Sequence, residues 1–170
     1  MKRLTALALI LALALTGCAG KKGAEKTLTP EERTELYKTA ITAARDAETN
    51  QVQPILTSAG EDDAEMAFAL LGVTPEDMSA YALSVSLMNV KAYAVAAVYP
   101  AAGKEDVVLE GLRAFIDNRK QSFEQYLADQ YEIAVNARLE TLEDGTVLLV
   151  MCENQDAVFD AISDAIVKGK

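Results

Sequence analysis

The sequence predicts an α+β domain, in which two β-hairpins form an antiparallel sheet of about four strands packed against helices, after an N-terminal lipoprotein signal peptide. Two pairs of apolar segments, each pair joined by a short turn, indicate hairpins. Segments with apolar residues at three- and four-residue steps precede, separate and follow these pairs, which indicates helices. Because single strands do not alternate with helices, we expect helices on one face of the sheet.

The first 17 residues have the layout of a secretory signal, with Lys2 and Arg3 followed by an apolar segment and a small-residue end. The apolar segment, residues 4–16, is shorter than the ~20 residues that a helix needs to cross the hydrocarbon core of a bilayer. A permanent transmembrane anchor is therefore not expected. An ordinary secretory signal is the alternative, but no Ala-x-Ala cleavage site precedes position 18.

A lipobox pattern ends this signal at Leu15, Thr16, Gly17 and Cys18. We expect cleavage before Cys18 and a diacylglyceryl group on its sulfur. Two acyl chains hold a protein stably on a membrane, whereas one chain holds it marginally. The chain then divides into a lipoprotein signal peptide (1–17), a lipidated cysteine with a flexible tether (18–28) and a single α+β domain (29–170). The domain is expected on the outer, extracytoplasmic face of the cell membrane.

The first predicted helix begins at Thr29, which is the N-cap of a capping box completed by Glu32. Its apolar spacing continues to about Thr49. Acidic residues favour the start of a helix through its dipole, so residues 61–71 predict a second, short helix. A calcium loop is the alternative for these acidic residues, but the alternating Asp pattern and the distal Glu are missing.

Gly72 is expected to end the second helix, and residues 74–77 repeat the capping pattern for a brief helical turn. Residues 81–102 then contain a single charged residue, Lys91, and resemble a second membrane segment. However, a lysine near the middle of a bilayer costs ~2.5–3.5 kcal/mol. Residues 81–87 also alternate with period two. We therefore predict a hairpin with strands at about 80–88 and 91–99, joined at Asn89-Val90.

The longest predicted helix opens at residues 103–106 and has an apolar face that ends at Tyr126. Residues 129–136 indicate a separate turn or two of helix. A second hairpin follows, with strands at 138–143 and 146–152 joined by a two-residue Asp144-Gly145 turn. Asn154 is expected to cap a last helix, whose buried stripe is Val158, Phe159, Ile162 and Ile166.

Composition excludes several functions. The net charge is −10, and it becomes −12 when the signal removes two cationic residues, which disfavours nucleic acid as a partner. The chain has no histidine, so Ser-His-Asp and Cys-His catalysis are excluded. No cofactor or metal site is predicted. If Cys18 is acylated, Cys152 has no partner for a disulfide, and its apolar surroundings indicate a buried structural thiol rather than a nucleophile.

From Tyr81 onward, several segments match a known family in order. They are Lys91-Ala92-Tyr93-Ala94-Val95, Lys120-Gln121-Ser122-Phe123-Glu124-Gln125-Tyr126, Gln130-Tyr131, Asn136-Ala137 and Gly145-Thr146-Val147-Leu148-Leu149-Val150. Together with the lipobox, they resemble an uncharacterised family of small bacterial lipoproteins, mainly Gram-positive, that have a domain of unknown function. Members often have an acidic residue before the second strand, where this chain has Tyr93. The resemblance implies a membrane-tethered domain and no particular activity.

Two functions from different classes remain open. The first is a non-catalytic binding or protein-interaction module that is tethered to the membrane through Cys18 and engages an exported protein or a cell-wall ligand. The alternative is a carboxylate-based hydrolase of an envelope polymer, which would need two acidic side chains ~5–9.5 Å apart in a cleft. A structural accessory subunit, recognisable by an exposed apolar strip, is a third hypothesis.

Overall fold

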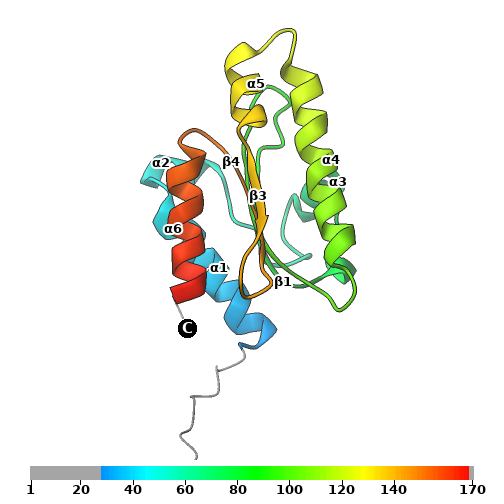
Figure 1. Cartoon of the computed structure of the whole chain (residues 1–170), viewed down its shortest axis with the longest axis vertical. Helices are drawn as coiled ribbons and strands as arrows, with labels where there is room; N and C mark the ends of the chain where they lie inside the picture. The colour runs from blue at the N-terminus through cyan, green and yellow to red at the C-terminus, as the bar shows by residue number, and fades with distance from the viewer. Residues whose placement is uncertain (1–27, 169–170) are drawn as a thin grey trace, which may run out of the picture.

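The computed structural model describes residues 28–168, so the predicted anchor and its cleavage site lie outside the described residues. The described chain forms a four-stranded antiparallel sheet with strand order β1-β2-β4-β3 (Figure 1). Its strands are β1 (Met78–Val85), β2 (Ala94–Pro100), β3 (Arg138–Thr141) and β4 (Val147–Met151). Its helices are α1 (Pro30–Ala44), α2 (Ala47–Val52), α3 (Ala64–Leu71), α4 (Glu105–Phe123), α5 (Ala128–Val135) and α6 (Gln155–Lys168), with a 3₁₀ turn, η1 (Pro75–Asp77). The predicted α+β class and both hairpins are confirmed.

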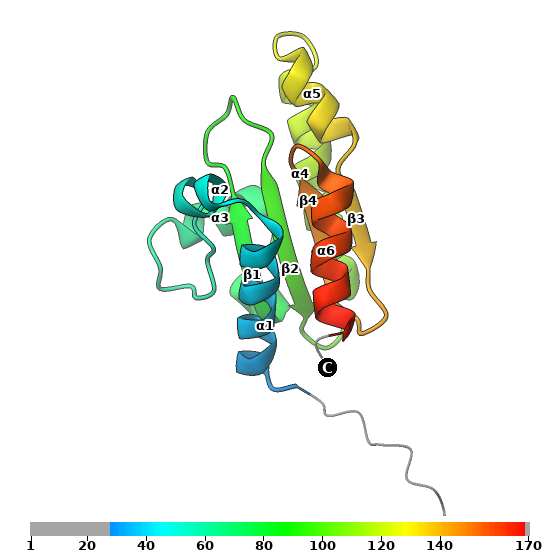
Figure 2. The same cartoon turned by 90° about the vertical axis from the view of Figure 1, so that its left-hand side faces the viewer.

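The sheet has a hydrophobic core on each face, so the expectation of helices on one face is wrong. α1 and α6 cover one face, while α3, α4 and α5 lie on the other (Figures 1 and 2). Leu148 belongs to the core that contains Tyr37 and Phe159, whereas the next residue, Leu149, belongs to the core that contains Leu112. β4 is buried at every position, and strands covered on both faces lose the apolar/polar alternation of a half-exposed strand.

The first predicted helix is divided at Arg45. The capping box of Thr29 and Glu32 is present, but α1 ends at Ala44 rather than near Thr49. Arg45 has an extended backbone, with φ −115° and ψ 156°, and Asp46 then caps α2 by accepting a hydrogen bond from the Thr49 N–H at 2.7 Å. The second capping signal therefore starts a new helix, which the apolar spacing alone did not reveal.

Two loops also differ from their predictions. α3 begins at Ala64 rather than at residue 61, because the Glu61 carboxylate accepts hydrogen bonds from the backbone N–H groups of Thr57 and Ser58 at 2.7 and 2.8 Å. Glu61 is thus held by the preceding loop. The first hairpin is joined by residues 86–93, a longer connection than the predicted turn at Asn89-Val90.

The second hairpin has a three-residue loop instead of the predicted two-residue turn. Leu142 and Thr146 still pair, since the Leu142 N–H donates to the Thr146 carbonyl at 2.7 Å. Within the loop, the Gly145 N–H donates to the Leu142 carbonyl at 3.0 Å, and Gly145 has φ 88°. A tight turn followed by a left-handed glycine is the usual three-residue hairpin connection. At the next boundary, Asn154 directly precedes α6 with a left-handed φ of 56°, but its side chain forms no capping hydrogen bond among the described residues.

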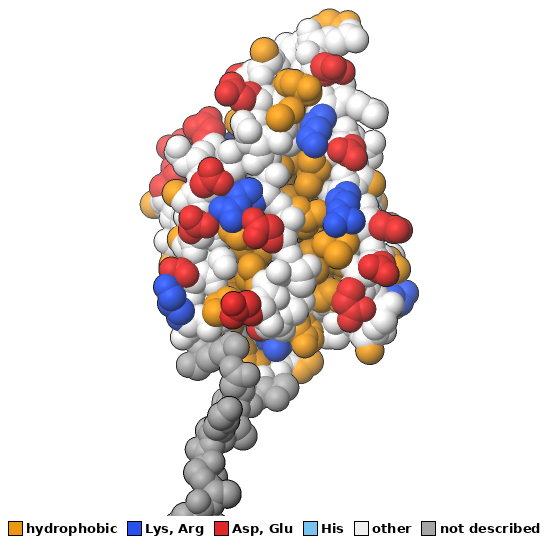
Figure 3. Space-filling view, viewed as in Figure 1, with side chains coloured by type: hydrophobic (Ala, Val, Ile, Leu, Met, Phe, Trp, Pro, Cys, Tyr) orange, Lys and Arg blue, Asp and Glu red, His pale blue; other side chains and the backbone are white. Residues whose placement is uncertain are grey.

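β3 forms one edge of the sheet and is protected by charge. The guanidinium of Arg138 pairs with Glu140 at 2.8 Å, and with Asp160 and Asp156 of α6 at 2.9 and 3.4 Å. Figure 3 shows such charged side chains grouped over β3 and α6, beside a band of hydrophobic side chains that runs toward α4. Charged residues on an edge strand disfavour pairing with another chain.

No helix within residues 28–168 is long and apolar enough to span a bilayer, and residues 81–102 form the predicted hairpin.

Candidate functional site

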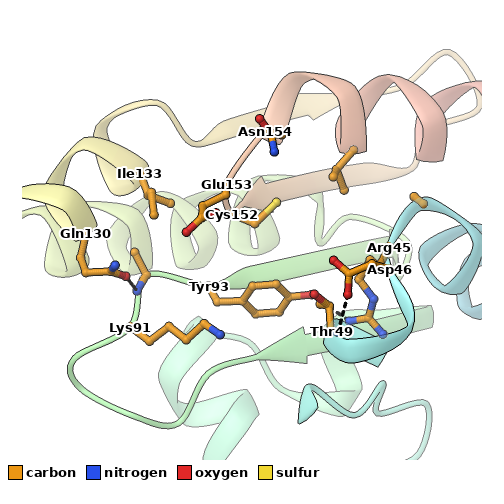
Figure 4. A pocket seen from close by; sticks show the side chains of 13 residues that line it. Arg45, Asp46, Thr49, Lys91, Tyr93, Gln130, Ile133, Cys152, Glu153 and Asn154 are labelled. Atoms are coloured by element: carbon orange, nitrogen blue, oxygen red, sulfur yellow. Dashed lines mark hydrogen bonds between the residues drawn. The ribbon is translucent and has the colours of Figure 1, made fainter. Parts of the chain in front are cut away.

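A cleft of about 380 Å³ opens where β1 ends and β2 begins. Its walls come from four segments that are distant in sequence: the α1–α2 junction, the β1–β2 loop, α5 and the β4–α6 loop (Figure 4). We call it the Arg45 cleft. Its volume lies near the lower end of the ~300–1,000 Å³ that is typical of small-molecule sites.

Neutral groups hold the Arg45 guanidinium in place. Nε and Nη2 donate to Asn50 Oδ1 at 3.0 and 2.7 Å, and Nη1 donates to Ser84 Oγ at 2.9 Å and to the Tyr93 hydroxyl at 2.8 Å. These bonds use four of the five N–H donors of an arginine. Arg45 forms no ion pair with any Asp or Glu among the described residues. The side chain is therefore fixed, while its charge has no short-range partner there.

The local sequence explains why Arg45 lies against the sheet. It follows Ile41 by four residues and Tyr37 by eight, so it continues the line of the buried face of α1 one residue beyond the end of the helix. Ser84 lies on the same face of β1 as the buried Ala82, which leaves a hydroxyl in reach of the guanidinium. An arginine in register with the buried face of α1 was the signal that the sequence offered for this site.

Tyr93 and Lys91 extend the same wall. The Tyr93 side chain is only 5% exposed, and burial raises the pKa of its phenol, so the hydroxyl stays neutral near pH 7. The Lys91 ammonium lies 5.8 Å from the centre of the Tyr93 ring and forms no ion pair within residues 28–168. Two cations without carboxylate partners thus border the cleft, in a chain with a net charge of −10.

Carboxylates lie at the rim of the cleft. The N–H of Thr49 lowers the pKa of Asp46, which is fixed as the cap of α2. Glu153 is exposed on the opposite wall, beside Cys152. Burial, and to a lesser extent the charge of Glu153, raises the pKa of the Cys152 thiol to about 11. The prediction that this thiol is buried is confirmed, and a raised pKa disfavours the thiolate that a reactive cysteine needs.

A second, more open depression adjoins the Arg45 cleft and shares Ile133, Glu153 and Asn154 with it. Four carboxylates line this depression, which we call the acidic trough: Asp129, Glu132, Glu153 and Asp156. In the part of the chain that the structure describes, no group of three or more metal-ligating side chains could hold a metal ion. Cationic and anionic regions therefore lie next to each other across Glu153.

A family model described as a domain of unknown function (DUF4358) matches residues 56–152. The chain belongs to the DUF4358 family. No curated protein and no solved structure matches it. The resemblance to a family with a domain of unknown function is thus confirmed, and the DUF4358 match begins earlier than Tyr81, where the resemblance began. The match contains the whole sheet with α3, α4 and α5, whereas α1 and α6 lie outside it.

The Arg45 cleft lies at the border of the DUF4358 segment. Lys91, Tyr93 and Gln130 come from inside the matched residues, while Arg45 and Asn154 come from the segments that flank them, at the α1–α2 junction and just before α6. The site residues predicted from sequence, Leu15 to Cys18, lie outside the described residues. Sequence reasoning did not predict the cleft, because its walls come together only when the helices before and after the DUF4358 segment cover the sheet.

Proposed function

We propose that this DUF4358 protein is a bacterial lipoprotein, anchored by a diacylated Cys18 on the outer face of the cell membrane, whose domain binds a small ligand without transforming it. The lipobox at residues 15–18 supports the anchor. The Arg45 cleft supports the binding role. A cation that four hydrogen bonds hold in place is ready for a ligand, and this lowers the cost of ordering the site when the ligand binds.

The position of the cleft is consistent with such an anchor. At the start of α1, Arg33 pairs with Asp144 of the β3–β4 turn at 2.7 Å, and at the end of α1, Arg45 reaches Ser84 and Tyr93. The 15 residues of α1 span ~22 Å between these two ends. Figure 2 shows the start of α1 and the β1–β2 loop at opposite ends of the sheet. The tether would therefore enter the domain far from the cleft, so that the cleft faces molecules of the envelope rather than the membrane.

The alternative hydrolase is supported by one observation, which is that Asp46 and Glu153 both line the cleft. A general acid for glycoside hydrolysis needs a raised pKa to stay protonated near neutral pH. The pKa of Asp46 is lowered instead, and its carboxylate caps α2. For this reason we favour binding over hydrolysis.

The anchor is tested by replacing Cys18 with alanine in a bacterial host. We expect the wild-type chain to incorporate labelled palmitate and to lose its first 17 residues, since acylation requires the Cys18 sulfur. Cys18→Ala should abolish both changes, measured by labelling and intact mass. Cys152→Ala is the matched control and should be labelled like the wild type. An unmodified Cys18 that still follows residues 1–17 in the membrane fraction would contradict the anchor.

Binding is tested by thermal unfolding of the full chain in detergent with amino acids, short peptides, sugars or inorganic phosphate. A ligand at 100 times its Kd adds ~2.7 kcal/mol to the free energy of unfolding, which raises the Tm of a chain of this size by roughly 5–10 °C. We expect at least one class to give such a shift and to be recovered chemically unchanged. If no class shifts the Tm, or if the bound compound is hydrolysed, the binding function is wrong.

A further inference from the structure

From the separation of charge across the cleft, we infer that the ligand is a zwitterion of amino-acid or short-peptide size. Its carboxylate contacts Arg45 and Lys91, and its ammonium group lies in the acidic trough. This inference rests on the proposed binding function and specifies the chemistry of its ligand. Figure 4 shows the arrangement, with Lys91 and Tyr93 on one side of the cleft and Glu153 and Asn154 on the other.

The cationic side fits a carboxylate. Arg45 Nη2 keeps one N–H that has no hydrogen-bond acceptor within residues 28–168, and Lys91 has no carboxylate partner there. Charge-assisted hydrogen bonds to carboxylates are about twice as strong as neutral ones. Asn50, Ser84 and Tyr93 orient the guanidinium with neutral oxygen atoms, so its positive charge is left for the ligand to compensate.

The anionic side fits an ammonium group. Two of the carboxylates of the acidic trough, Glu132 and Glu153, form no ion pair among the described residues. Asp156 is paired only at 3.4 Å with Arg138, and its side chain is 79% exposed. Because Glu153 lines both the trough and the cleft, one molecule can reach both charges.

Net charge distinguishes a zwitterion from an anion. The chain has a net charge of −10, and Asp46 and Glu153 also line the cleft, so a dianion such as phosphate is repelled as it approaches. A zwitterion has no net charge to repel, and a dipeptide with one basic side chain, such as Ala-Lys, has a net charge of +1 at neutral pH and is attracted. A neutral sugar would leave the charges of Arg45 and Lys91 uncompensated. A dipeptide satisfies both ends and suits a cleft of about 380 Å³ that continues into the trough.

Calorimetric titration of the full chain in detergent tests this inference with the dipeptide Ala-Lys as probe. Three comparison probes are its C-terminal amide, its form acetylated on both amines, and inorganic phosphate. We expect Ala-Lys to bind. The amide should bind at least tenfold more weakly because it lacks the carboxylate, and the acetylated form should bind at least about threefold more weakly because it lacks the ammonium groups. Phosphate should not bind measurably.

Three substitutions assign the two ends, and a fourth is the control. Arg45→Gln should weaken Ala-Lys about tenfold or more, and Lys91→Gln about threefold, while neither should weaken the amide further. Glu153→Gln should weaken Ala-Lys but not its acetylated form. Lys38→Gln removes an exposed cation of α1 that does not line the cleft, and it should leave binding unchanged. Since Arg45 also joins α1 to the sheet, Lys91→Gln in the β1–β2 loop decides the result if Arg45→Gln fails to fold.

The outcomes separate this inference from the proposed function. If Ala-Lys and its amide bind equally, or if Lys91→Gln weakens both equally, the carboxylate contact is wrong. If phosphate or a neutral sugar binds and Ala-Lys does not, the zwitterion is wrong while the binding function stands. If none of these compounds binds, this inference fails, and the binding function then depends on the wider thermal screen.

Discussion

Replacing Gly111 with alanine should lower the free energy of unfolding by about 3 kcal/mol or more, because α3 and α4 meet there backbone to backbone. A Cβ atom on Gly111 would lie 2.2 Å from the carbonyl oxygen of Gly72 and 2.8 Å from its carbonyl carbon. Neither atom can rotate away as a side chain would. Alanine gains ~1 kcal/mol over glycine as a helix former, but this gain is smaller than the cost of separating the two helices.

Gly60→Ala is the matched control for Gly111→Ala. A Cβ at Gly60 would meet only Ser58 Oγ, at 3.9 Å, so the free energy of unfolding should change by ~0.5 kcal/mol or less. Urea denaturation of both variants measures the difference. If Gly111→Ala were as stable as the wild type, the close approach of α4 to the end of α3 would be wrong.

Gly111 also illustrates which features the sequence could not predict. Gly72 was expected to end α3, and it does so with φ 68°, since a helix end depends on residues within one turn. The need for glycine at position 111 depends on a helix about 40 residues away in the chain. Such a contact leaves no local pattern in the sequence. The need for glycine at position 111 could therefore not be predicted from its neighbours in the chain.

The same distinction between local and distant contacts applies to the caps and the sheet. The capping signals at Thr29 and Thr74 were predicted because both partners lie within three residues, and both are present. The second helical layer was not predicted. The small residues of β1 were a signal for it, since Ala80 and Ala82 pack against the core that contains Tyr37.

The Arg45 cleft was not predicted because the sequence places its walls far apart. Arg45 and Tyr93 are 48 residues apart in the chain, yet they form a hydrogen bond of 2.8 Å. Tyr93 was noted only as the residue that replaces an acidic one in the family resemblance. Once Arg45 is beside it, the neutral hydroxyl accepts a hydrogen bond from the guanidinium, a role that a carboxylate could also fill as an ion pair.

Replacing either Leu148 or Leu149 with alanine should cost ~2–5 kcal/mol of the free energy of unfolding, although the two side chains point to opposite faces of β4. Both are 0% exposed. Leu148 lies in the core beneath α1 and α6, and Leu149 lies in the core beneath α3 and α4. Each substitution removes the same atoms from a closely packed interior and leaves a cavity, so the two losses should be of similar size.

Leu87→Ala is the control for this pair, because it deletes the same atoms from a side chain that is 36% exposed in the β1–β2 loop. Its cost should stay below ~1 kcal/mol. In a sheet with helices on one face, one of Leu148 and Leu149 would face solvent and its replacement would resemble Leu87→Ala. Equal and large losses in urea denaturation thus require a core on both faces, and this is the arrangement that brings α1, and with it Arg45, against the DUF4358 sheet.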